Sequence, residues 1–398
     1  MKKKIVISVV TAVALLFVCS FFVSAKRGIY VNNSKTMLSG LFSENYAIGS
    51  NGTKLLDSDD VYVLSARGLT DLSSMNAIEE GVGGGGLLFD DGSVRIKSDV
   101  VKVGLSFNFN RAGTDTTVEE AAFTNTSGGG FVFGYYDNDR EFVELDETEE
   151  STVYVFSLEP ETLFLGVYDG EGELLYETSH PNTKDNFIAI RPISEDEDVL
   201  TKYDGNRYYG DFELGYTAGD GITVINTVNI EQYLKGVIAL EMIANAPLEA
   251  YKAQAVAARS YAQRCIKNTD LYDYYGFDVT NNTYYQAYYG YYVPSSASYA
   301  TISRAVEETE NEYLTYNGSV INAMFCAANG GESVDGGYPY LIGYEDPYEG
   351  DVWTKGPMGH RIGMSQWGAY AMAKNYKMDY QSILGFYYTK VGISYGYF

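Results

Sequence analysis

The best candidate for catalysis in this sequence is an acidic residue that ends an apolar helix pattern. Residues 231–240 place apolar side chains at helical spacing, and Glu241 follows them directly. Pro247 and Glu249 suit the first turn of a second helix, which we expect to continue through Arg264. Glu241 therefore lies at an elbow between two helices. Apolar neighbours disfavour the charged form of a carboxyl group and raise its pKa, as a general acid near neutral pH requires.

The elbow alone does not decide the role of Glu241, because capping or neutralising a helix end would place a glutamate there equally well. The second helix carries a face of small residues, Ala250, Ala253, Ala257 and Ala258. Small side chains at this spacing let another element approach the helix backbone closely. We therefore expect this helix to lie at the centre of its domain.

Two long motifs carry a resemblance to a known family. The first, YLKGVIALEMIANAPLEAYKAQAVAARSYA, runs from Tyr233 to Ala262, and the second, GHRIGMSQWGAYAMA, runs from Gly359 to Ala373. In this order they resemble the motifs of the stage II sporulation protein D family, the SpoIID/LytB family, which includes the LytB amidase enhancer. The resemblance extends over about residues 187–398, roughly half of the chain.

The resemblance implies a lytic transglycosylase that cleaves peptidoglycan strands lacking stem peptides. The catalytic glutamate of the family precedes the Met of the first motif, which here is Glu241. That residue would protonate the bond between N-acetylmuramic acid and N-acetylglucosamine and later act as the base, leaving 1,6-anhydro ends. The resemblance also implies a set of substrate-binding residues: Arg259, Tyr261, Gln286, Tyr288, Gly330, Gly331, His360, Ser365 and Gln366.

Two further functions stay open beside catalysis. Amidase-enhancer relatives imply a protein that binds glycan or recruits a cell-wall amidase without cutting the strand itself. A scaffold in a wall-remodelling complex is the third option. The connection before the second motif is short, and Arg361 stands where the family has glycine, which leaves room for a role without catalysis.

Charge and composition narrow the classes of partner. The 398 residues carry a net charge of −25, so nucleic acid and anionic membrane surfaces are poor partners, whereas a neutral glycan is compatible. Some members of the resembled family hold zinc near the catalytic centre, but residues 270–292 contain neither Cys nor His. We therefore expect no metal and no cofactor. Cys265 and Cys326 could pair in an exported protein or remain as two buried thiols.

The N-terminus predicts export across the cytoplasmic membrane. Residues 5–25 contain no charge, follow the basic start MKKK and precede Lys26 and Arg27. This length suits a single transmembrane span, although residues 23–25 could also form a signal-peptide cleavage site. Either alternative places the rest of the chain outside the cytoplasmic membrane, as a single-pass membrane protein or as one secreted to the cell wall.

The remaining pattern predicts an α+β protein in three parts: the anchor at 1–27, a β-rich accessory region at 28–200 and a mixed α/β catalytic domain at 201–398. Short β-branched and aromatic runs predict strands at 101–108, 130–136, 151–158, 162–168 and 187–193. The acidic residues between 137 and 150 indicate a solvated loop. In the third part we expect helices at 295–311 and 380–388 and a hairpin at 313–328 that turns at Asn317-Gly318.

A tyrosine-rich stretch follows the second helix. Nine of the 22 residues from 271 to 292 are tyrosines, whose rings and hydroxyls suit contact with sugars. Tyrosine is abundant throughout this chain, with 38 in all, so an ordinary packing role is the alternative.

Overall fold

The computed structural model describes residues 89–397 except 110–113, 138, 160–163, 179–186, 196–197, 218–220 and 269. Before residue 89 it describes only the backbone of seven short strands: β1 (Ile5–Ile7), β2 (Val10–Ala12), β3 (Leu15–Phe17), β4 (Phe21–Val23), β5 (Ile29–Val31), β6 (Tyr62–Ser65) and β7 (Gly68–Asp71). The rest of the predicted anchor lies outside the described residues, and the anchor stays a prediction. In the part of the chain that is described, no helix is both long and apolar enough to cross a membrane.

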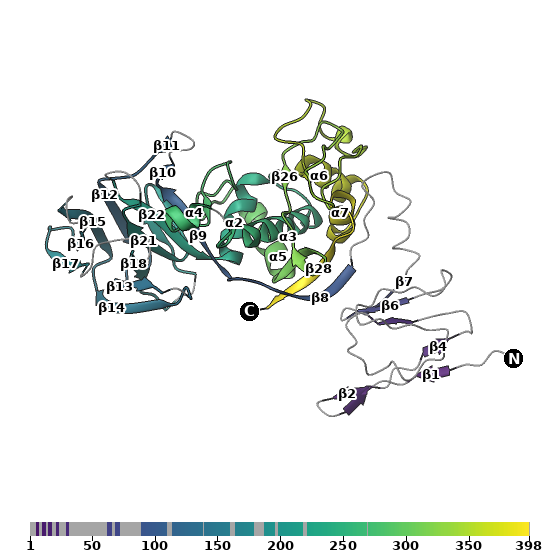
Figure 1. Ribbon diagram of the computed structural model, residues 1–398, viewed down its shortest axis with the longest axis horizontal. Coiled ribbons are helices and arrows are strands. Elements are labelled where there is room, and N and C mark those ends of the chain that lie inside the picture. The colour runs from purple at the N-terminus through teal and green to yellow at the C-terminus, as the bar shows by residue number, and fades with distance from the viewer. Residues whose placement is uncertain are drawn as a thin grey trace.

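Two sheets form the β-rich part of the protein (Figure 1). The first has the strand order β17 (Leu174–Glu177), β16 (Phe164–Tyr168), β15 (Thr152–Glu159), β12 (Glu120–Asn125), β19 (Thr201–Tyr203) and β20 (Asn206–Tyr208). The second has the order β14 (Phe142–Thr148), β13 (Phe131–Tyr136), β18 (Ile188–Pro192), β21 (Asp211–Gly215), β22 (Thr223–Asn229), β9 (Val100–Ser106) and β23 (Val279–Thr280). A short pair, β10 (Asn108–Phe109) and β11 (Thr114–Asp115), lies beside them.

Aromatic side chains join the two sheets into a sandwich. Phe123 of the first sheet contacts Phe212 of the second, with ring centroids 4.7 Å apart. Tyr176 stacks on Phe133 at 5.4 Å in the same way. Alternate residues along β12 are buried, as one inward face of a strand requires. The sandwich thus has a core of its own between the two sheets.

The strands predicted between residues 101 and 193 are confirmed as β9, β13, β15, β16 and β18. The prediction of a solvated loop at 137–150 is wrong in part. Residues 142–148 form β14, which pairs with β13 at the edge of the second sheet and leaves its acidic side chains exposed. An edge strand can expose many of its side chains to water. The charged residues of β14 therefore resembled those of a loop in the sequence.

Strands on both sides of residue 200 belong to the same two sheets. β19 pairs with β12, and β21 pairs with β18, so residues 201–229 complete both sheets. The predicted division of the chain at residues 27 and 200 stays a prediction. In space, the sandwich extends to Asn229, where the helical part begins.

The helical part surrounds one long helix (Figure 1). Helix α3 (Leu248–Cys265) contacts α2 (Ile230–Glu241), α5 (Ser296–Glu308), α6 (Gln366–Asn375) and α7 (Tyr380–Tyr387). Its alanines at 250, 253, 257 and 258 are all fully buried, which confirms the predicted central helix. The short helices α4 (Asp270–Tyr275) and η2 (Glu349–Asp351) complete this part.

A small sheet closes the helical part. Its order is β25 (Ser319–Val320), β24 (Glu312–Tyr316), β28 (Gly392–Tyr397) and β8 (Phe89–Arg95). The predicted turn between β24 and β25 is confirmed, with positive φ angles of 51° at Asn317 and 73° at Gly318. The hairpin does not extend to residue 328, because β26 (Phe325–Cys326) pairs in parallel with β27 (Met364–Ser365) instead.

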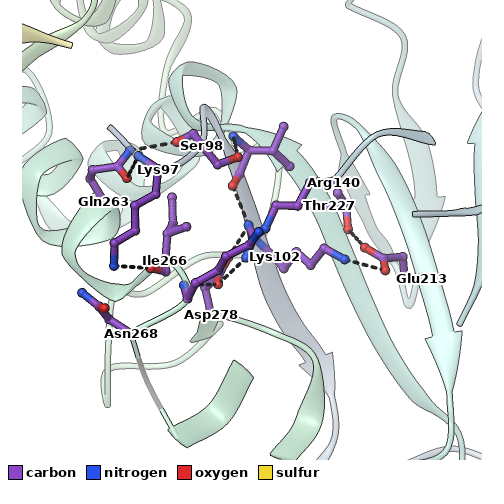
Figure 2. A network of polar contacts seen from close by, with 12 residues as sticks. Lys97, Ser98, Lys102, Arg140, Glu213, Thr227, Gln263, Ile266, Asn268 and Asp278 are labelled. Carbon is purple, nitrogen blue, oxygen red and sulfur yellow. Dashed lines mark hydrogen bonds and ion pairs between the residues drawn. The ribbon is translucent and has the colours of Figure 1, made fainter. Parts of the chain in front are cut away.

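A buried ion pair lies at the edge of the second sheet, where the end of α3 meets that sheet (Figure 2). Arg140, which follows β13, contacts Asp278 with a distance of 2.7 Å from Nη2 to Oδ1, and their side chains are 2% and 0% exposed. Asp278 also accepts hydrogen bonds from the backbone amides of Lys102 and Lys267. Its charge is therefore compensated by three donors from separate segments.

Two more buried contacts extend this network (Figure 2). Lys102 donates to Glu213 at 2.7 Å, and Glu213 also accepts from the hydroxyl of Thr227. The amide of Gln263, near the end of α3, donates to the carbonyl of Ser98 at 2.8 Å and accepts from the backbone of Lys97 at 2.9 Å. The end of the central helix is thus fixed to the segment that leads into β9.

Candidate active site

Helix α2 places Glu241 at its last position. The helix begins after Asn229, whose side chain accepts a hydrogen bond from the amide of Glu231 and so caps the helix. The elbow that follows is fixed by Tyr251 of α3, whose hydroxyl donates to the carbonyl of Ile243 at 3.0 Å and accepts from the amide of Ala246 at 3.2 Å. The direction of the chain after Glu241 is thus set by hydrogen bonds.

The Glu241 carboxyl group is largely removed from water. Burial raises its pKa, whereas a hydrogen bond from the backbone amide of Ala287 and the nearby side chain of Gln366 lower it. The Ala287 amide donates to Oε1 at 2.8 Å. Burial is the largest of these effects, so the carboxyl group holds its proton at a higher pH than an exposed glutamate does. This is the property required of a general acid.

Gln366 approaches Glu241 from the second motif. It is the first residue of α6, is 2% exposed and follows Ser365, which caps this helix by accepting from the amide of Gly368. The Gln366 amide favours the charged form of Glu241. Its Nε2 makes no hydrogen bond of ordinary geometry to any residue that the structure describes. This buried amide therefore acts on the Glu241 carboxyl group from the start of α6.

Tyr261 lies near the same carboxyl group, and Phe325 links Tyr261 to His360. Burial is the main cause that raises the pKa of the Tyr261 hydroxyl, and Glu241 adds to the shift. The Tyr261 ring meets Phe325 edge-on, with centroids 6.3 Å apart. Partial burial lowers the pKa of His360 and a hydrogen bond with the Phe325 backbone opposes this, so the imidazole is neutral at pH 7.

Gly330 and Gly331 form a loop that is held by two acidic residues. Their φ angles are +78° and +90°, which few other residues adopt. The amide of Gly330 donates to Glu349 at 2.7 Å, and the amide of Asp346 donates to the carbonyl of Gly331 at 2.9 Å. Glu349 also accepts from Ser365, so the glycine loop and the start of α6 share one buried carboxylate.

Sequence reasoning missed Asp346 and Glu349. Both are at most 3% exposed, and Asp346 accepts hydrogen bonds from the side chains of Asn329 and Tyr387. They fall in the segment GYEDPYEGD, where exposed acids alternate with them without a helical or strand period. No pattern in this segment separates the buried acids from the exposed ones.

Three of the predicted binding residues have a structural place instead. Arg259 is fully buried and donates from Nε to Glu231 at 2.8 Å, which joins α3 to the start of α2. Tyr288 is also fully buried, and its hydroxyl donates to Asn226 at 2.9 Å. Gln286 is fully buried and accepts from the hydroxyl of Tyr233 at 3.1 Å. These three side chains are too deeply buried to contact a substrate directly.

Gln286 nevertheless acts on the site through its neighbour. Its amide donates to the carbonyl of Ala258 on α3 at 3.3 Å. Together with the contact to Tyr233, this fixes the backbone on which the Ala287 amide points at Glu241. Gln286 is therefore a positioning residue for the carboxyl group.

The second carboxylate that could support hydrolysis faces another way. Glu249 accepts a hydrogen bond at 2.9 Å from the amide of Tyr380, the first residue of α7, and contacts Lys252. A negative charge is favourable at this helix end. Glu249 thus has the capping role that its position suggested, although it caps α7 and not its own helix.

Arg361 replaces the family's glycine and keeps a glycine-like backbone. Its φ angle is 62°, in the left-handed region that disfavours side chains with a Cβ atom. The guanidinium donates to the carbonyls of Asn329 and Glu332 at 3.1 Å and 2.9 Å. The side chain therefore links the second motif to the glycine loop.

Cys265 and Cys326 are free buried thiols, and burial raises the pKa of each to about 12. Within the described ranges, no group of three or more His, Cys, Asp or Glu residues could hold a metal ion.

Comparison with known proteins gives the relationships of the chain. The model of the family described as stage II sporulation protein matches residues 218–316. An uncharacterized protein of Brachyspira hyodysenteriae is 30% identical over 288 residues, which cover 50% of this chain and 76% of that protein. The amidase enhancer of Bacillus subtilis is 35% identical over 180 residues, covering 43% of this chain and 24% of the relative.

Stage II sporulation protein D of Bacillus subtilis is 31% identical over 144 residues, covering 31% of this chain and 40% of that protein. The chain thus spans less than half of either Bacillus relative. The matched segment 218–316 contains α2, α3 and the Ala287 amide, which are the elements that hold Glu241. The two motifs, the family model and the relatives agree, and the chain belongs to the SpoIID/LytB family.

Proposed function

We propose that this protein is a peptidoglycan lytic transglycosylase with Glu241 as its single acid and base. The observation that carries the proposal is the half-buried Glu241 carboxyl group, whose pKa burial raises and which one backbone amide holds in place. A second carboxylate is not needed for this reaction, and Glu249 is engaged at the start of α7.

In this mechanism the Glu241 carboxyl group gives its proton to the glycosidic oxygen between N-acetylmuramic acid and N-acetylglucosamine. The 6-hydroxyl of the muramic acid attacks the anomeric carbon as the glycosidic bond breaks. The Glu241 carboxylate takes the proton of that hydroxyl and returns to its acid form. No water is consumed, and the new ends are a 1,6-anhydro ring and a free 4-hydroxyl.

The setting proposed for this reaction is the cell wall. The apolar segment at 5–25 would either anchor the chain in the cytoplasmic membrane or direct its secretion. The β-sandwich would then hold glycan or a partner protein beside the helical part.

A second candidate function is the enhancement of a cell-wall amidase without catalysis. The similarity to a protein named amidase enhancer favours it, since that identity is no lower than the identity to stage II sporulation protein D. On this alternative, Glu241 and Gln366 bind glycan, and the sandwich recruits the amidase.

The deciding experiment incubates the full-length protein with purified peptidoglycan before and after enzymatic removal of the stem peptides. Mass spectrometry then measures 1,6-anhydromuramyl ends and reducing ends. We expect anhydro ends from the peptide-free strands with the wild type and none with Glu241→Gln. Glu249→Gln is the matched control, because it neutralises a carboxylate that faces α7, and it should retain activity.

Two other results would contradict the proposed transglycosylase activity. Reducing ends in place of anhydro ends would mean hydrolysis and a second carboxylate. Intact strands that remain bound to the protein would contradict catalysis and support the enhancer function. An amidase assay with the wild type added would then test that function directly.

A further inference from the structure

The only two tryptophans of the chain lie together beside the proposed catalytic centre. Trp353 and Trp367 stack with ring centroids 5.1 Å apart and an angle of 22° between the rings. Trp367 directly follows Gln366, the residue next to Glu241. The stacked pair thus adjoins, along α6, the side chain that lies next to the Glu241 carboxyl group.

The aromatic pair is rigidly held and half-exposed. The indole nitrogen of Trp353 donates to the carbonyl of Gly356 at 2.7 Å, and the backbone amide of Trp367 donates to the carbonyl of Ala327 at 3.1 Å. Tyr370 meets Trp367 edge-on at 5.6 Å and extends the row. All three side chains are partly exposed, so a sugar ring can reach them.

A positive charge stands at the end of this row. The ammonium group of Lys355 lies 5.3 Å from the centre of the Trp353 ring, and the residue is exposed. Within the described part of the chain, Lys355 forms no ion pair, whereas the nearby Arg361 pairs with Glu332 at 3.2 Å. Asp351, the nearest acid along the chain, accepts a hydrogen bond from Tyr376. Lys355 is thus a free cation on a strongly acidic protein.

We propose that Trp353, Trp367 and Lys355 form a subsite for a muramic acid residue whose lactyl carboxylate is free. The rings would support the sugar, and Lys355 would pair with the carboxylate. In intact peptidoglycan this carboxyl group is an amide of the stem peptide and carries no charge. Removal of the peptide exposes the anion, so the subsite selects peptide-free strands. The proposal rests on the proposed function and adds a physical basis for its substrate choice.

Tryptophan emission tests this proposal directly, because both tryptophans belong to the subsite. The full-length Glu241→Gln variant, which binds without turnover, is titrated with three ligands. These are peptide-free glycan oligomers, the same oligomers with stem peptides, and chito-oligosaccharides, which lack the lactyl group. We expect a saturable emission change and the tightest binding with the peptide-free oligomers.

Lys355→Gln should weaken binding of the peptide-free oligomers about fivefold, the value of one partly exposed ion pair, and leave binding of chito-oligosaccharides unchanged. Lys355→Arg should restore most of the affinity. Lys202→Gln, which removes an exposed lysine from the first sheet, is the matched control and should change neither.

Equal affinity of the Lys355→Gln variant and its parent for peptide-free oligomers would overturn the subsite. Equal affinity of the parent for peptide-free oligomers and chito-oligosaccharides would do the same. If Lys355-dependent binding is found but the wild type makes no anhydro ends, the subsite stands and the proposed catalysis fails. If no glycan binds at all, both are overturned.

Discussion

The backbone amide of Ala287 donates a hydrogen bond to Oε1 of Glu241 at 2.8 Å. This contact favours the charged carboxylate, while the burial of Glu241 favours the protonated form. The two effects oppose each other on one group that must both give and take a proton. A general acid and base benefits from such a balance, because its pKa should lie near the working pH.

Replacement of Glu241 by Gln should stabilise the folded protein at neutral pH. Burial raises the pKa of Glu241 in the folded state above its value in the unfolded chain. The folded state therefore loses stability as pH rises from the unfolded pKa through the folded pKa, and an amide does not have this cost. Thermal unfolding of both proteins between pH 4 and pH 8 should show a Tm difference in favour of the variant that grows with pH. A constant difference would contradict the raised pKa.

Replacement of Gln286 by Met should lower the stability of the fold and raise the pKa of Glu241. The change keeps the volume of the side chain and leaves the Tyr233 hydroxyl and the Ala258 carbonyl without their partner. The free energy of unfolding should fall by about 1–3 kcal/mol. Loss of the Ala287 contact removes an effect that lowers the pKa of Glu241, so the basic limb of the pH–rate profile should move to higher pH.

The pH profile separates positioning from simple destabilisation. Asn226→Ala removes the partner of the Tyr288 hydroxyl and so weakens packing nearby without touching the Ala287 amide. It should reduce stability and leave the basic limb in place. An unchanged profile in Gln286→Met would mean that the Ala287 amide does not depend on this side chain.

Two substitutions of Arg361 should separate the contribution of its side chain to stability from the cost of its backbone conformation. Arg361→Ala loses the hydrogen bonds to Asn329 and Glu332 and keeps a Cβ atom at a φ angle of 62°. Arg361→Gly loses the same bonds but relieves the backbone, which is worth about 1–2 kcal/mol. Denaturant unfolding should therefore rank the alanine variant below the glycine variant. The reverse order would show that the positive φ angle is not retained in the variants.

The ion pair between Arg140 and Asp278 should stabilise the junction between the second sheet and the end of α3. Asp278→Asn leaves the buried guanidinium of Arg140 without a charged partner, which costs about 3–5 kcal/mol. A double variant, Arg140→Met with Asp278→Asn, should recover part of this loss, because it removes the uncompensated charge. Urea unfolding measures both. Equal stability of the single variant and the wild type would exclude the ion pair as a joint.

The sequence predicted the helical part more completely than the contacts that hold it. The elbow at Glu241, the N-cap at Asn229 and the turn at Asn317-Gly318 depend on local signals, and the structure has all three. Long-range pairs have no such signal. Arg140 stands in an acidic segment of the sequence, yet its partner Asp278 lies 138 residues further along the chain.

The candidate site shows the same division. The two motifs contain Glu241 and Gln366, and the structure places these two side chains next to each other. The motifs did not distinguish a residue that faces a ligand from one that supports the site from behind. Arg259 and Tyr288 belong to the motifs and to the tyrosine-rich loop, but burial and internal partners occupy both side chains.

The parallel pairing of β8 with β28 has a mechanical consequence. β8 is the first strand of the described body, and its partner ends the chain, with Phe89 opposite Gly392 and Arg95 opposite Tyr397. A pulling force along β8, with the helical part held in place, would load all the hydrogen bonds between the two strands at the same time, in shear. A joint of this kind resists pulling better than one whose bonds open in turn. For the proposed wall function, a force from the N-terminal side would then reach the helical part through this pair of strands.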